Sequence, residues 1–334
     1  MSAIHDTIGW GILATGKIAR SFCRDLALVP DARVAAVGSR SRAAAEDFAA
    51  LFGGRAHGSY EALVADPEVD VVYVATPHAL HADHVRLAFE AGKPVLCEKP
   101  MTLDAATSEA LVAEARERGL FLMEAMWTAC HPMVRTLVGL VAGGEYGRPG
   151  QLVADLGFAV DVPPTDRLLD PALGASALLD MGIYPLTLAH LLLGEPERTA
   201  AVAQLSEGGI DLAIAMSLAY PSGATAALTA SMATWTPRSA TLATDRGRFD
   251  IAAEFHHPTR VTFTPYDAGG AGTPEVIEAE EPVIGVGYGN EVVEVHRCLR
   301  AGLQESPLVP HAQTLALLRQ MDAIRAQVGI RFPD

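Results

Sequence analysis

Apolar and polar positions divide the chain into two halves with different patterns. Up to residue 124, short continuous apolar runs alternate with amphipathic stretches of helical period. Continuous apolar strands that alternate with helices are typical of a parallel sheet covered on both faces. We therefore expect an α/β Rossmann domain, a doubly wound parallel sheet, over residues 1–124. Strands are expected at 7–13, 33–37, 69–75, 95–97 and 120–124, with helices at 42–52, 60–65, 81–91 and 103–118 and one that ends near Leu28.

After Glu124 the alternation stops and runs with strand composition dominate. Their valine and threonine content and their glycine or proline turns favour a large, mostly antiparallel sheet. Such a sheet often leaves one face open, so we expect residues 125–334 to form an α+β domain for substrate binding and oligomerisation. A homodimer or homotetramer through this sheet is the expected assembly. The expected strands are 151–158, 199–204, 211–220, 225–233, 239–244, 247–251, 260–263 and 275–279, with helices at 133–142 and up to Leu193.

Charge and cysteine usage narrow the class of partner. The 334 residues include 25 Lys and Arg against 40 Asp and Glu, a formal charge of −15 that is spread along the chain. Nucleic acid and anionic membranes both require clustered basic residues, so neither is expected as a partner. The cysteines form no Cys-x-x-Cys pair, and residues 1–6 lack the basic and apolar segments of a secretory signal. A cytoplasmic protein with reduced cysteines is expected.

The first predicted strand leads into a glycine turn and a helix. That layout directs backbone N–H groups and a helix N-terminus at a pyrophosphate. Only the middle glycine of the G-x-G-x-x-G pattern is present, and a small-residue turn is also required by any tight strand-to-helix connection. The position between a strand and a helix nevertheless predicts a dinucleotide site. The residues assigned to it are Gly11, Ala14, Thr15, Gly16, Lys17 and Ile18.

The end of the second strand indicates which dinucleotide is bound. An NAD site normally has an acidic residue there, which binds the ribose 2′-hydroxyl. This chain has Ser39, Arg40 and Arg42 instead, and a hydroxyl followed by guanidinium groups suits a 2′-phosphate. NADP(H) is therefore expected in preference to NAD(H). The alternative to phosphate binding is an arginine that is exposed to solvent at the start of the helix 42–52 and contacts no cofactor.

Ionisable residues follow two further strands. Glu98 and Lys99 precede Pro100, and a lysine held beside a carboxylate and shielded from water can orient a substrate oxygen and take part in proton transfer. The simpler alternative is a surface lysine in a turn that ends at proline. The other strand-end residues expected near the nicotinamide or ribose are Ala75, Thr76, Pro77, His78 and His81, while His84 is expected to be an ordinary helix-surface residue.

In the second half, Asp180 and Tyr184 are four residues apart, so one helical turn would place both on one face. Gly182 and Pro185 indicate that the helix is broken there. A phenol beside a lysine and a carboxylate is a plausible proton relay, whereas a capping aspartate and a core tyrosine are the structural alternative. No metal site is expected, because the adjacent His256 and His257 would point in opposite directions on an extended chain.

These motifs resemble the glucose-fructose oxidoreductase and inositol dehydrogenase family (Gfo/Idh/MocA). The resemblance spans nearly the whole chain, and segments 123–128 and 305–308 are most similar to the branch of dimeric trans-1,2-dihydrodiol dehydrogenase and NADP-dependent D-xylose dehydrogenase. The sequence departs from the family pattern at Ala14, at 175–176, at 128–130 and at Pro185. The motifs that carry the resemblance are the turn near Gly16, Thr76-Pro77-His78, Glu98-Lys99-Pro100 and Leu178-Leu179-Asp180-Met181-Gly182-Ile183-Tyr184.

The resemblance implies an oxidoreductase that transfers a hydride between NADP(H) and an alcohol or hemiacetal carbon of a sugar, a polyol or a trans-dihydrodiol. It implies that Lys99 is catalytic. We assign Tyr184 as proton donor and acceptor, Lys99 as the group that lowers its pKa and holds the substrate oxygen, and Asp180 as substrate orienter or second member of the proton relay. Glu98 and Trp127 are assigned to the cofactor site, and Trp127 and Phe158 are candidate walls of the substrate pocket. Arg167 either contacts substrate or is a loop charge.

Two other functional classes compete with this interpretation. A catalytically silent NADP sensor of the same fold has no reason to keep Lys99, Asp180 and Tyr184 together. A hydroxyacid dehydrogenase would require an Arg and His pair at matching strand ends, and the sequence places none there.

Overall fold

The computed structural model describes residues 6–163 and 166–332, and its chain forms two compact units. Unit 1 comprises Met1–Cys130 and Val283–Leu315, and unit 2 comprises His131–Pro282 and Ala316–Asp334. The sequence predicted a single boundary after residue 124. In the structure, the late segment Val283–Leu315 also belongs to unit 1.

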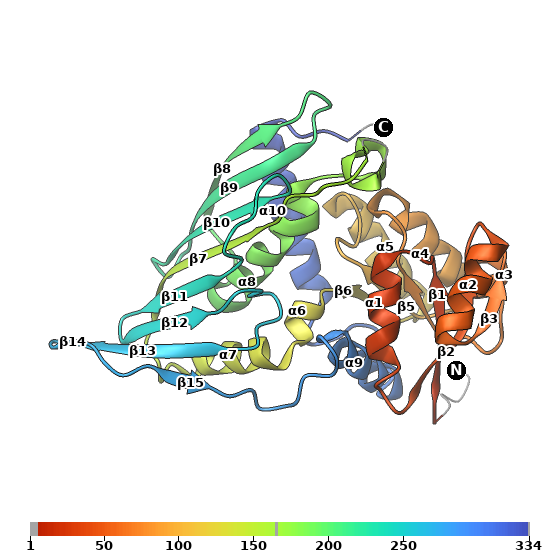
Figure 1. Cartoon of the computed structure of the whole chain (residues 1–334), viewed down its shortest axis with the longest axis horizontal. Coiled ribbons are helices and arrows are strands. Elements are labelled where there is room, and N and C mark those ends of the chain that lie inside the picture. The colour runs from red at the N-terminus through yellow and green to blue at the C-terminus, as the bar shows by residue number, and fades with distance from the viewer. Residues whose placement is uncertain (1–5, 164–165, 333–334) are drawn as a thin grey trace. The chain divides into compact units, whose positions relative to one another are not determined.

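Unit 1 contains a six-stranded sheet in which every pair of neighbouring strands is parallel (Figure 1). The strand order, β3-β2-β1-β4-β5-β6, is that of a doubly wound Rossmann sheet, so the predicted fold class is confirmed. All residues of β1, β4, β5 and β6 are buried, as continuous apolar strands require. The strands are β1 (Ile8–Leu13), β2 (Ala32–Gly38), β3 (Arg55–His57), β4 (Val71–Val74), β5 (Val95–Glu98) and β6 (Leu122–Ala125).

Three helices of this unit begin at a side-chain cap. Ser41, Ser59 and Asp104 each accept a hydrogen bond from the backbone N–H three residues later, which satisfies a donor that the helix itself leaves open. The helices are α1 (Lys17–Leu26), α2 (Arg42–Phe52), α3 (Tyr60–Val64), η1 (His78–Leu80), α4 (His81–Glu90), α5 (Ala105–Arg118), α6 (Trp127–Cys130) and α9 (Tyr288–Arg300).

Helix α9 belongs to unit 1 because buried polar contacts join it to the first strand and helix. The indole N–H of Trp10 in β1 donates to Nε2 of His296 in α9 over 3.0 Å. Asp25 in α1 accepts hydrogen bonds from three backbone N–H groups, those of residues 286, 287 and 288, where α9 begins. These contacts explain why the segment after residue 282 packs with the Rossmann sheet, an arrangement that hydrophobic periodicity alone did not predict.

Unit 2 contains a large, mostly antiparallel sheet, as predicted. Its strand order is β14-β13-β12-β11-β7-β10-β9-β8, with β15 paired to β13, and only β7 and β10 run parallel. The strands are β7 (Pro149–Gly157), β8 (Arg198–Leu205), β9 (Asp211–Ala219), β10 (Thr225–Ser231), β11 (Ala240–Thr244), β12 (Gly247–Ile251), β13 (Val261–Asp267), β14 (Gly270–Ala271) and β15 (Glu275–Ile277).

Side chains alternate across this sheet with period two. Leu152, Met216 and Leu228 are almost completely buried, whereas Val153 and Val202 on neighbouring positions are 47% and 71% exposed. One face therefore packs in the core and the other is open to solvent. The helices of the unit are α7 (Pro132–Gly143), η2 (Arg167–Leu169), η3 (Pro171–Leu173), the π-helical turn η4 (Leu178–Gly182) and α8 (Ile183–Leu193), and α10 (His311–Val328) begins in unit 1 and continues in unit 2.

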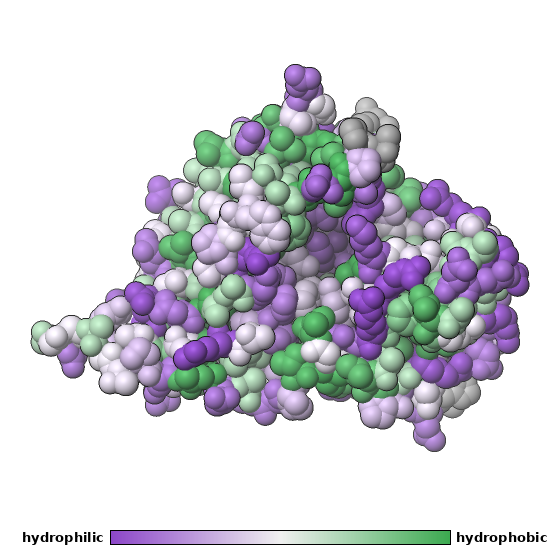
Figure 2. All heavy atoms as spheres, in the orientation of Figure 1, coloured by the Kyte–Doolittle hydropathy of each residue, from purple (hydrophilic) through white to green (hydrophobic). Residues whose placement is uncertain are grey.

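The surface is mixed in character. Hydrophilic and hydrophobic side chains are interspersed over the face drawn in Figure 2.

By length and composition alone, the helical stretch Pro171–Leu193 could cross a membrane, with 23 residues and a mean hydropathy of 1.4 in its most apolar window. However, 78% of that window is buried inside the protein, as is usual for a core helix. The stretch is therefore only weak evidence for a membrane span.

Candidate functional site

The residues predicted to bind the cofactor follow the carboxyl ends of neighbouring strands in unit 1. Ala14 follows β1, Ala75 follows β4 and Lys99 follows β5. These strands are adjacent and parallel. The strand order reverses between β1 and β4, and doubly wound sheets bind their ligands in the crevice at such a switch point. The predicted residues therefore share the edge of the sheet where a dinucleotide would bind.

The turn after β1 is shaped for a ligand phosphate. A Cβ atom added to Gly16 would meet no atom of the described residues within 4 Å, so the backbone there is open to close approach. Helix α1 begins directly after Gly16, and no described side chain caps its N-terminus. Uncapped N–H groups at a helix start bind anions. The turn thus fits the pyrophosphate of a dinucleotide.

Ala14 occupies this turn in an unusual backbone conformation. Its φ of 94° lies in the left-handed region that favours glycine, at the position where the motif normally has its first glycine. Its N–H donates to the Gly38 carbonyl over 3.1 Å, which fixes the turn to the end of β2. The alanine therefore keeps the geometry of the glycine motif at the expense of local strain.

The two arginines after β2 have different surroundings. Arg42 forms an exposed ion pair with Glu46 one turn along α2, at 2.8 Å. Arg40 lies beside Tyr60, whose pKa is raised by burial and lowered by a hydrogen bond and the charge of Arg40. Ser39 is buried, and its hydroxyl accepts the N–H of Ser41 over 3.2 Å. Arg40 is exposed, and its guanidinium is hydrogen-bonded to Tyr60.

The histidines after β4 support the strand ends. His81 is completely buried, and its two ring nitrogens lie 2.8 Å from the Thr76 carbonyl and 2.9 Å from the Pro100 carbonyl. Burial lowers its pKa to about 3, against the carbonyl groups of Thr76 and Pro100, which raise it. It joins the end of β4 to the turn after β5. His84 differs from the expectation of a surface residue, because its Nδ1 lies 3.0 Å from the Thr76 hydroxyl.

Glu98 is held in place by two donors. The Tyr73 hydroxyl donates to Oε1 in a short hydrogen bond, and the backbone N–H of Lys99 donates to Oε2 over 3.2 Å. Burial, followed by the charge of Glu98, raises the pKa of Tyr73 well above its usual value, so the phenol keeps its proton. Lys99 itself is half-buried, which excludes the expectation of a freely solvated surface lysine. The pair is thus fixed at the end of β5.

Two further carboxyl groups lie buried in the same unit. Glu124 at the end of β6 accepts the Met101 N–H and the Thr314 hydroxyl, at 2.8 and 2.9 Å. Glu291 in α9 is 1% exposed, and neither of its oxygens has a hydrogen-bond partner among the described residues. Burial, then the charges of Glu98 and Glu124, raises the pKa of Glu291 well above its usual value. Sequence analysis gave no indication of Glu291.

Trp127 is also part of unit 1. It begins α6 and is 5% exposed. Its ring stacks on Tyr288 with centroids 4.4 Å apart. Tyr288 is the first residue of α9, so the late segment of the chain supports the tryptophan that the sequence assigned to the cofactor and substrate sites.

In unit 2, Asp180 lies in the π-helical turn η4 and Tyr184 in the first turn of α8. The predicted break at Gly182 is therefore a change of helix type, because Gly182 and Ile183 keep helical backbone angles and the π-helical turn runs directly into α8. A Cβ added to Gly182 would lie 3.0 Å from Leu178, so the turn is closely packed. Tyr184 is 8% exposed and Asp180 is half-buried.

A second aspartate, which sequence analysis missed, anchors this turn. Asp211 at the start of β9 is completely buried and accepts the Leu178 N–H over 2.7 Å. Burial and, to a smaller extent, the charge of Asp180 raise the pKa of Asp211 to about 6. A buried polar residue at a strand start gives no distinctive signal in a sequence without homologues.

Tyr184 has an unpredicted neighbour. Its ring centroid lies 4.9 Å from that of His256, in the turn after β12. Phe158 is half-buried at the end of β7 with its ring 6.3 Å from that of Trp235, and Arg167 is exposed in η2. Unit 2 thus brings Asp180 and Tyr184 onto one short helical segment and adds a histidine beside the phenol. Lys99 and Trp127 belong to unit 1.

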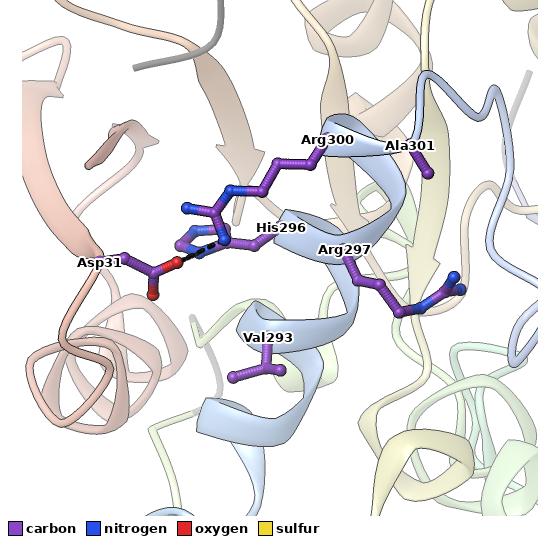
Figure 3. A pocket seen from close by; sticks show the side chains of 6 residues that line it. All are labelled: Asp31, Val293, His296, Arg297, Arg300 and Ala301. Atoms are coloured by element: carbon purple, nitrogen blue, oxygen red, sulfur yellow. Dashed lines mark ion pairs between the residues drawn. The ribbon is translucent and has the colours of Figure 1, made fainter. Parts of the chain in front are cut away.

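A separate cavity of about 440 Å³ lies beside α9 in unit 1 (Figure 3). Arg300 forms an ion pair with Asp31 over 2.6 Å, and Arg297 forms one with Glu294 over 2.8 Å. Both guanidinium groups are therefore already engaged by carboxylates. None of the residues predicted for cofactor or substrate binding lines this cavity, so it is not the candidate active site.

Comparison with known proteins gives matches over both halves of the chain. Residues 8–126 match the model of an oxidoreductase family with an NAD-binding Rossmann fold (GFO_IDH_MocA), and residues 134–252 match the GFO/IDH/MocA C-terminal domain. The trans-1,2-dihydrobenzene-1,2-diol dehydrogenase of Oryctolagus cuniculus is 35% identical, with 97% of this chain and 99% of that protein covered. The D-xylose 1-dehydrogenase (NADP⁺) of Hypocrea jecorina is 34% identical, with coverage of 98% and 94%.

Solved structures agree with these matches. A 3-ketoreductase from Actinomadura kijaniata in complex with NADP is similar over 96% of this chain and 98% of that chain, with a TM-score of 0.83 and 28% identity. An aldose-aldose oxidoreductase from Caulobacter crescentus is similar over 97% and 98%, with a TM-score of 0.86 and 26% identity.

Proposed function

Because this chain belongs to the Gfo/Idh/MocA oxidoreductase family, we propose that it transfers a hydride between NADP(H) and a secondary alcohol or hemiacetal carbon. The substrate class is a sugar, a cyclic polyol or a trans-dihydrodiol, in line with the names of its dehydrogenase and reductase relatives. The observation that carries the proposal is the edge of unit 1 that combines an open glycine turn with the fixed Glu98 and Lys99 pair. Unit 1 is the proposed cofactor domain, and unit 2 the substrate and oligomer domain.

The nicotinamide supplies or accepts the hydride when it is bound. Three residues of this chain are assigned to the proton that moves with it. Tyr184 takes the substrate hydroxyl proton during oxidation and returns it during reduction, Lys99 holds the substrate oxygen, and Asp180 orients the substrate. These roles require the three groups to act on one substrate molecule, which the kinetics of variants test.

Lys99→Met is the first variant to measure. Lys99 holds the oxygen whose proton Tyr184 takes, and losing general acid–base catalysis costs about 10²–10⁴-fold in turnover, so kcat should fall by at least about 100-fold. NADPH affinity, followed by fluorescence, should change little. Lys93→Met is a matched control, because Lys93 also lies beside β5 but donates to the Val69 carbonyl over 2.6 Å at the other end of the strand. Equal losses of turnover in both variants would show that lysine removal acts through folding and would reject the catalytic role.

The cofactor preference is assigned to Arg40. A charged hydrogen bond is worth about 1.5–3 kcal/mol, so Arg40→Ala should raise KM for NADPH about 10- to 100-fold and leave KM for NADH nearly unchanged. Arg42→Ala is the comparison variant, because its guanidinium already pairs with Glu46, and its effect should be smaller. An equal increase for both cofactors in Arg40→Ala would contradict contact with the 2′-phosphate.

Turnover with purified protein separates an enzyme from a silent sensor. NADPH formation is followed by absorbance with NADP or NAD and a panel of aldoses, inositols and trans-dihydrodiols. Oxidation of any member with NADP supports the proposal and selects the substrate class. Tight NADPH binding without turnover in either direction across the panel would favour the regulatory alternative.

The open face of the unit 2 sheet is proposed as a homo-oligomer interface. Small and apolar side chains cover it, and a flat, solvent-exposed apolar face of this kind is typical of association sites. Val202→Asp in β8 should convert the assembly to monomers in light scattering, whereas Leu51→Asp, at a residue 64% exposed in unit 1, should not. A wild-type monomer would reject the interface. The side chains on this face include Val153, Ala200, Val202, Ala215, Ser217, Ala227 and Thr229.

A cytoplasmic location is proposed from the cysteines. Cys23, Cys97, Cys130 and Cys298 are all buried and free. Reduced thiols without disulfides are typical of a reducing compartment. Fractionation of cells that produce the tagged chain tests the assignment, and recovery in a secreted fraction would contradict it.

A further inference from the structure

The turn between β12 and β13 brings three ligand-type side chains together in unit 2. Glu254 has a φ of 64°, and the N–H of His257 donates back to its carbonyl over 2.8 Å. The chain is therefore folded tightly here rather than extended, which removes the premise on which the sequence excluded a metal. The rings of His256 and His257 lie with centroids 4.4 Å apart.

The donor atoms converge on a small space. Oε2 of Glu254 lies 4.0 Å from Nδ1 of His256 and 4.0 Å from Nε2 of His257, and one ligand atom from each residue lies within 4.8 Å of the others. Two ligands about 2.1 Å from a tetrahedral ion are separated by roughly 3.4 Å. The two carboxylate–imidazole gaps would have to close by about 0.6 Å, and the gap between the two imidazole nitrogens by at most about 1.4 Å, to place all three atoms at coordinating distance.

A third histidine, His131, lies close enough to this group for the charge of His257 to act on it. His131 is 2% exposed, and its Nδ1 has no hydrogen-bond partner among the described residues. Burial and then the charge of His257 lower its pKa to about 4. Burial also lowers the pKa of His257, against the charge of Glu254, which raises it. Metal binding requires the neutral form of an imidazole, and burial favours that form.

The surroundings hold the carboxylate in place. Nη2 of Arg238 pairs with Oε1 of Glu254 over 2.9 Å, so Oε2 is the oxygen directed at the histidines. The side chains of Glu254 and His257 are 34% and 27% exposed, which gives an ion access from solvent. An outer partner that orients a ligand is a regular part of metal sites, although the positive charge of Arg238 limits the affinity.

We propose that Glu254, His256 and His257 bind a divalent transition-metal ion, with His131 as a candidate fourth ligand. Imidazole and carboxylate donors select Zn²⁺, Co²⁺ or Ni²⁺ over Mg²⁺ and Ca²⁺, which prefer all-oxygen sites. Because the ring of His256 lies 4.9 Å from that of Tyr184, the ion would be bound beside the proposed proton donor. Binding itself does not depend on the proposed oxidoreductase function.

The test uses the full chain after treatment with a chelator that is then removed. Titration with CoCl₂ should produce the visible absorption of cobalt in a nitrogen and oxygen site, and calorimetry with ZnCl₂ should give a single equivalent per chain. MgCl₂ should give no signal. Binding should weaken as the pH falls, because the imidazoles must be deprotonated.

Variants locate the ion. Glu254→Gln keeps the side-chain shape, and His257→Asn changes a partly exposed residue, so both should fold, and each should weaken Zn²⁺ binding by about tenfold or more. His190→Gln, in α8, is the control and should bind as the wild type does. Circular dichroism verifies folding. Absence of binding in the wild type, or equal affinity in all three variants, would overturn the proposal. Loss of binding in His131→Asn would establish the fourth ligand, and its retention would limit the site to three protein ligands.

Discussion

Asp25 is predicted to be the residue that fixes the start of α9. Its Oδ2 accepts the backbone N–H groups of Val286, Gly287 and Tyr288 at 2.8, 3.2 and 3.0 Å, and the residue is 5% exposed. Gly287 at the helix N-cap has no side chain with which to cap the helix. The carboxylate from α1 therefore supplies the cap, and its removal should loosen α9.

The size of the effect follows from these contacts. Each buried donor left without a partner costs about 1–3 kcal/mol, and water entering the vacated space restores part of that loss. We therefore expect Asp25→Ala to reduce the free energy of unfolding of unit 1 by about 3–5 kcal/mol. Asp25→Asn keeps an acceptor oxygen but loses the negative charge at the helix N-terminus, so its cost should be roughly 1–2 kcal/mol.

Hydrogen exchange is the appropriate assay, because a chain with two units need not unfold in one step. Peptides that cover α9 should exchange faster in Asp25→Ala than in the wild type, with an intermediate rate in Asp25→Asn. Peptides from unit 2 strands serve as the internal control. Wild-type protection of α9 in Asp25→Ala would refute the capping role.

Gly285 provides an independent check on the same contact. Its φ is 67°, and a Cβ added to it would lie 2.1 Å from Cγ of Asp25. Gly285→Ala should therefore destabilise α9 through a clash in addition to the left-handed backbone penalty of about 1 kcal/mol. In the Asp25→Ala background the clash disappears and only the backbone penalty should remain. Additive effects in the double variant would contradict this geometry.

Three further predictions concern buried polar groups. Folding raises the pKa of Glu291, so this residue stabilises the fold at low pH, and the contribution is lost as the pH rises through the folded pKa. The free energy of unfolding of Glu291→Gln should therefore increase relative to that of the wild type by up to about 1.4 kcal/mol per pH unit above pH 4.5. A difference between the two proteins in urea unfolding that does not change with pH would contradict this expectation. The pKa of Asp211 is raised to about 6, so the residue stabilises the fold below its usual pKa, and up to about 3 kcal/mol of this stabilisation is lost as the pH rises through 6. The melting temperature of Asp211→Asn should therefore depend less on pH between pH 4 and 7 than that of the wild type. An equal pH dependence in both proteins would reject the assignment. Trp10→Phe deprives His296 of its donor and should cost about 1–2 kcal/mol in thermal unfolding, whereas an unchanged melting temperature would show that the bond contributes little.

The Rossmann sheet could be predicted because its strands follow the simplest pattern. Runs such as Val71–Val74 are apolar at every position because both faces of the sheet are covered, and the glycine turn marks the first connection. The strands of unit 2 could be predicted from their valine and threonine content and from the glycine and proline turns between them. Helix α9 was missed because Glu291, Glu294 and His296 are buried on its inner face, which hides the apolar stripe of an amphipathic helix.

Part of the candidate site could be predicted from the sequence and part could not. Glu98 and Lys99 could be located because strand ends can be identified from the hydrophobic pattern. The proximity of His256 to Tyr184 could not be, since it depends on a turn in which Glu254, not a glycine, has a positive φ. Backbone conformations of that kind are enforced by surrounding contacts and leave no local signal.

The buried acids of unit 1 bear on how a chain with a formal charge of −15 accepts an anionic cofactor. Every ionised carboxylate near the strand ends repels the phosphates, and the sequence places Glu98 and Glu124 there. Glu124 is surrounded by the Met101 N–H and the Thr314 hydroxyl, and burial raises its pKa. Burial and the charges of Glu98 and Glu124 raise the pKa of Glu291 well above its usual value. Both shifts favour the neutral form of the acid, and the Gly16 turn and Arg40 offer the donors that an anion requires.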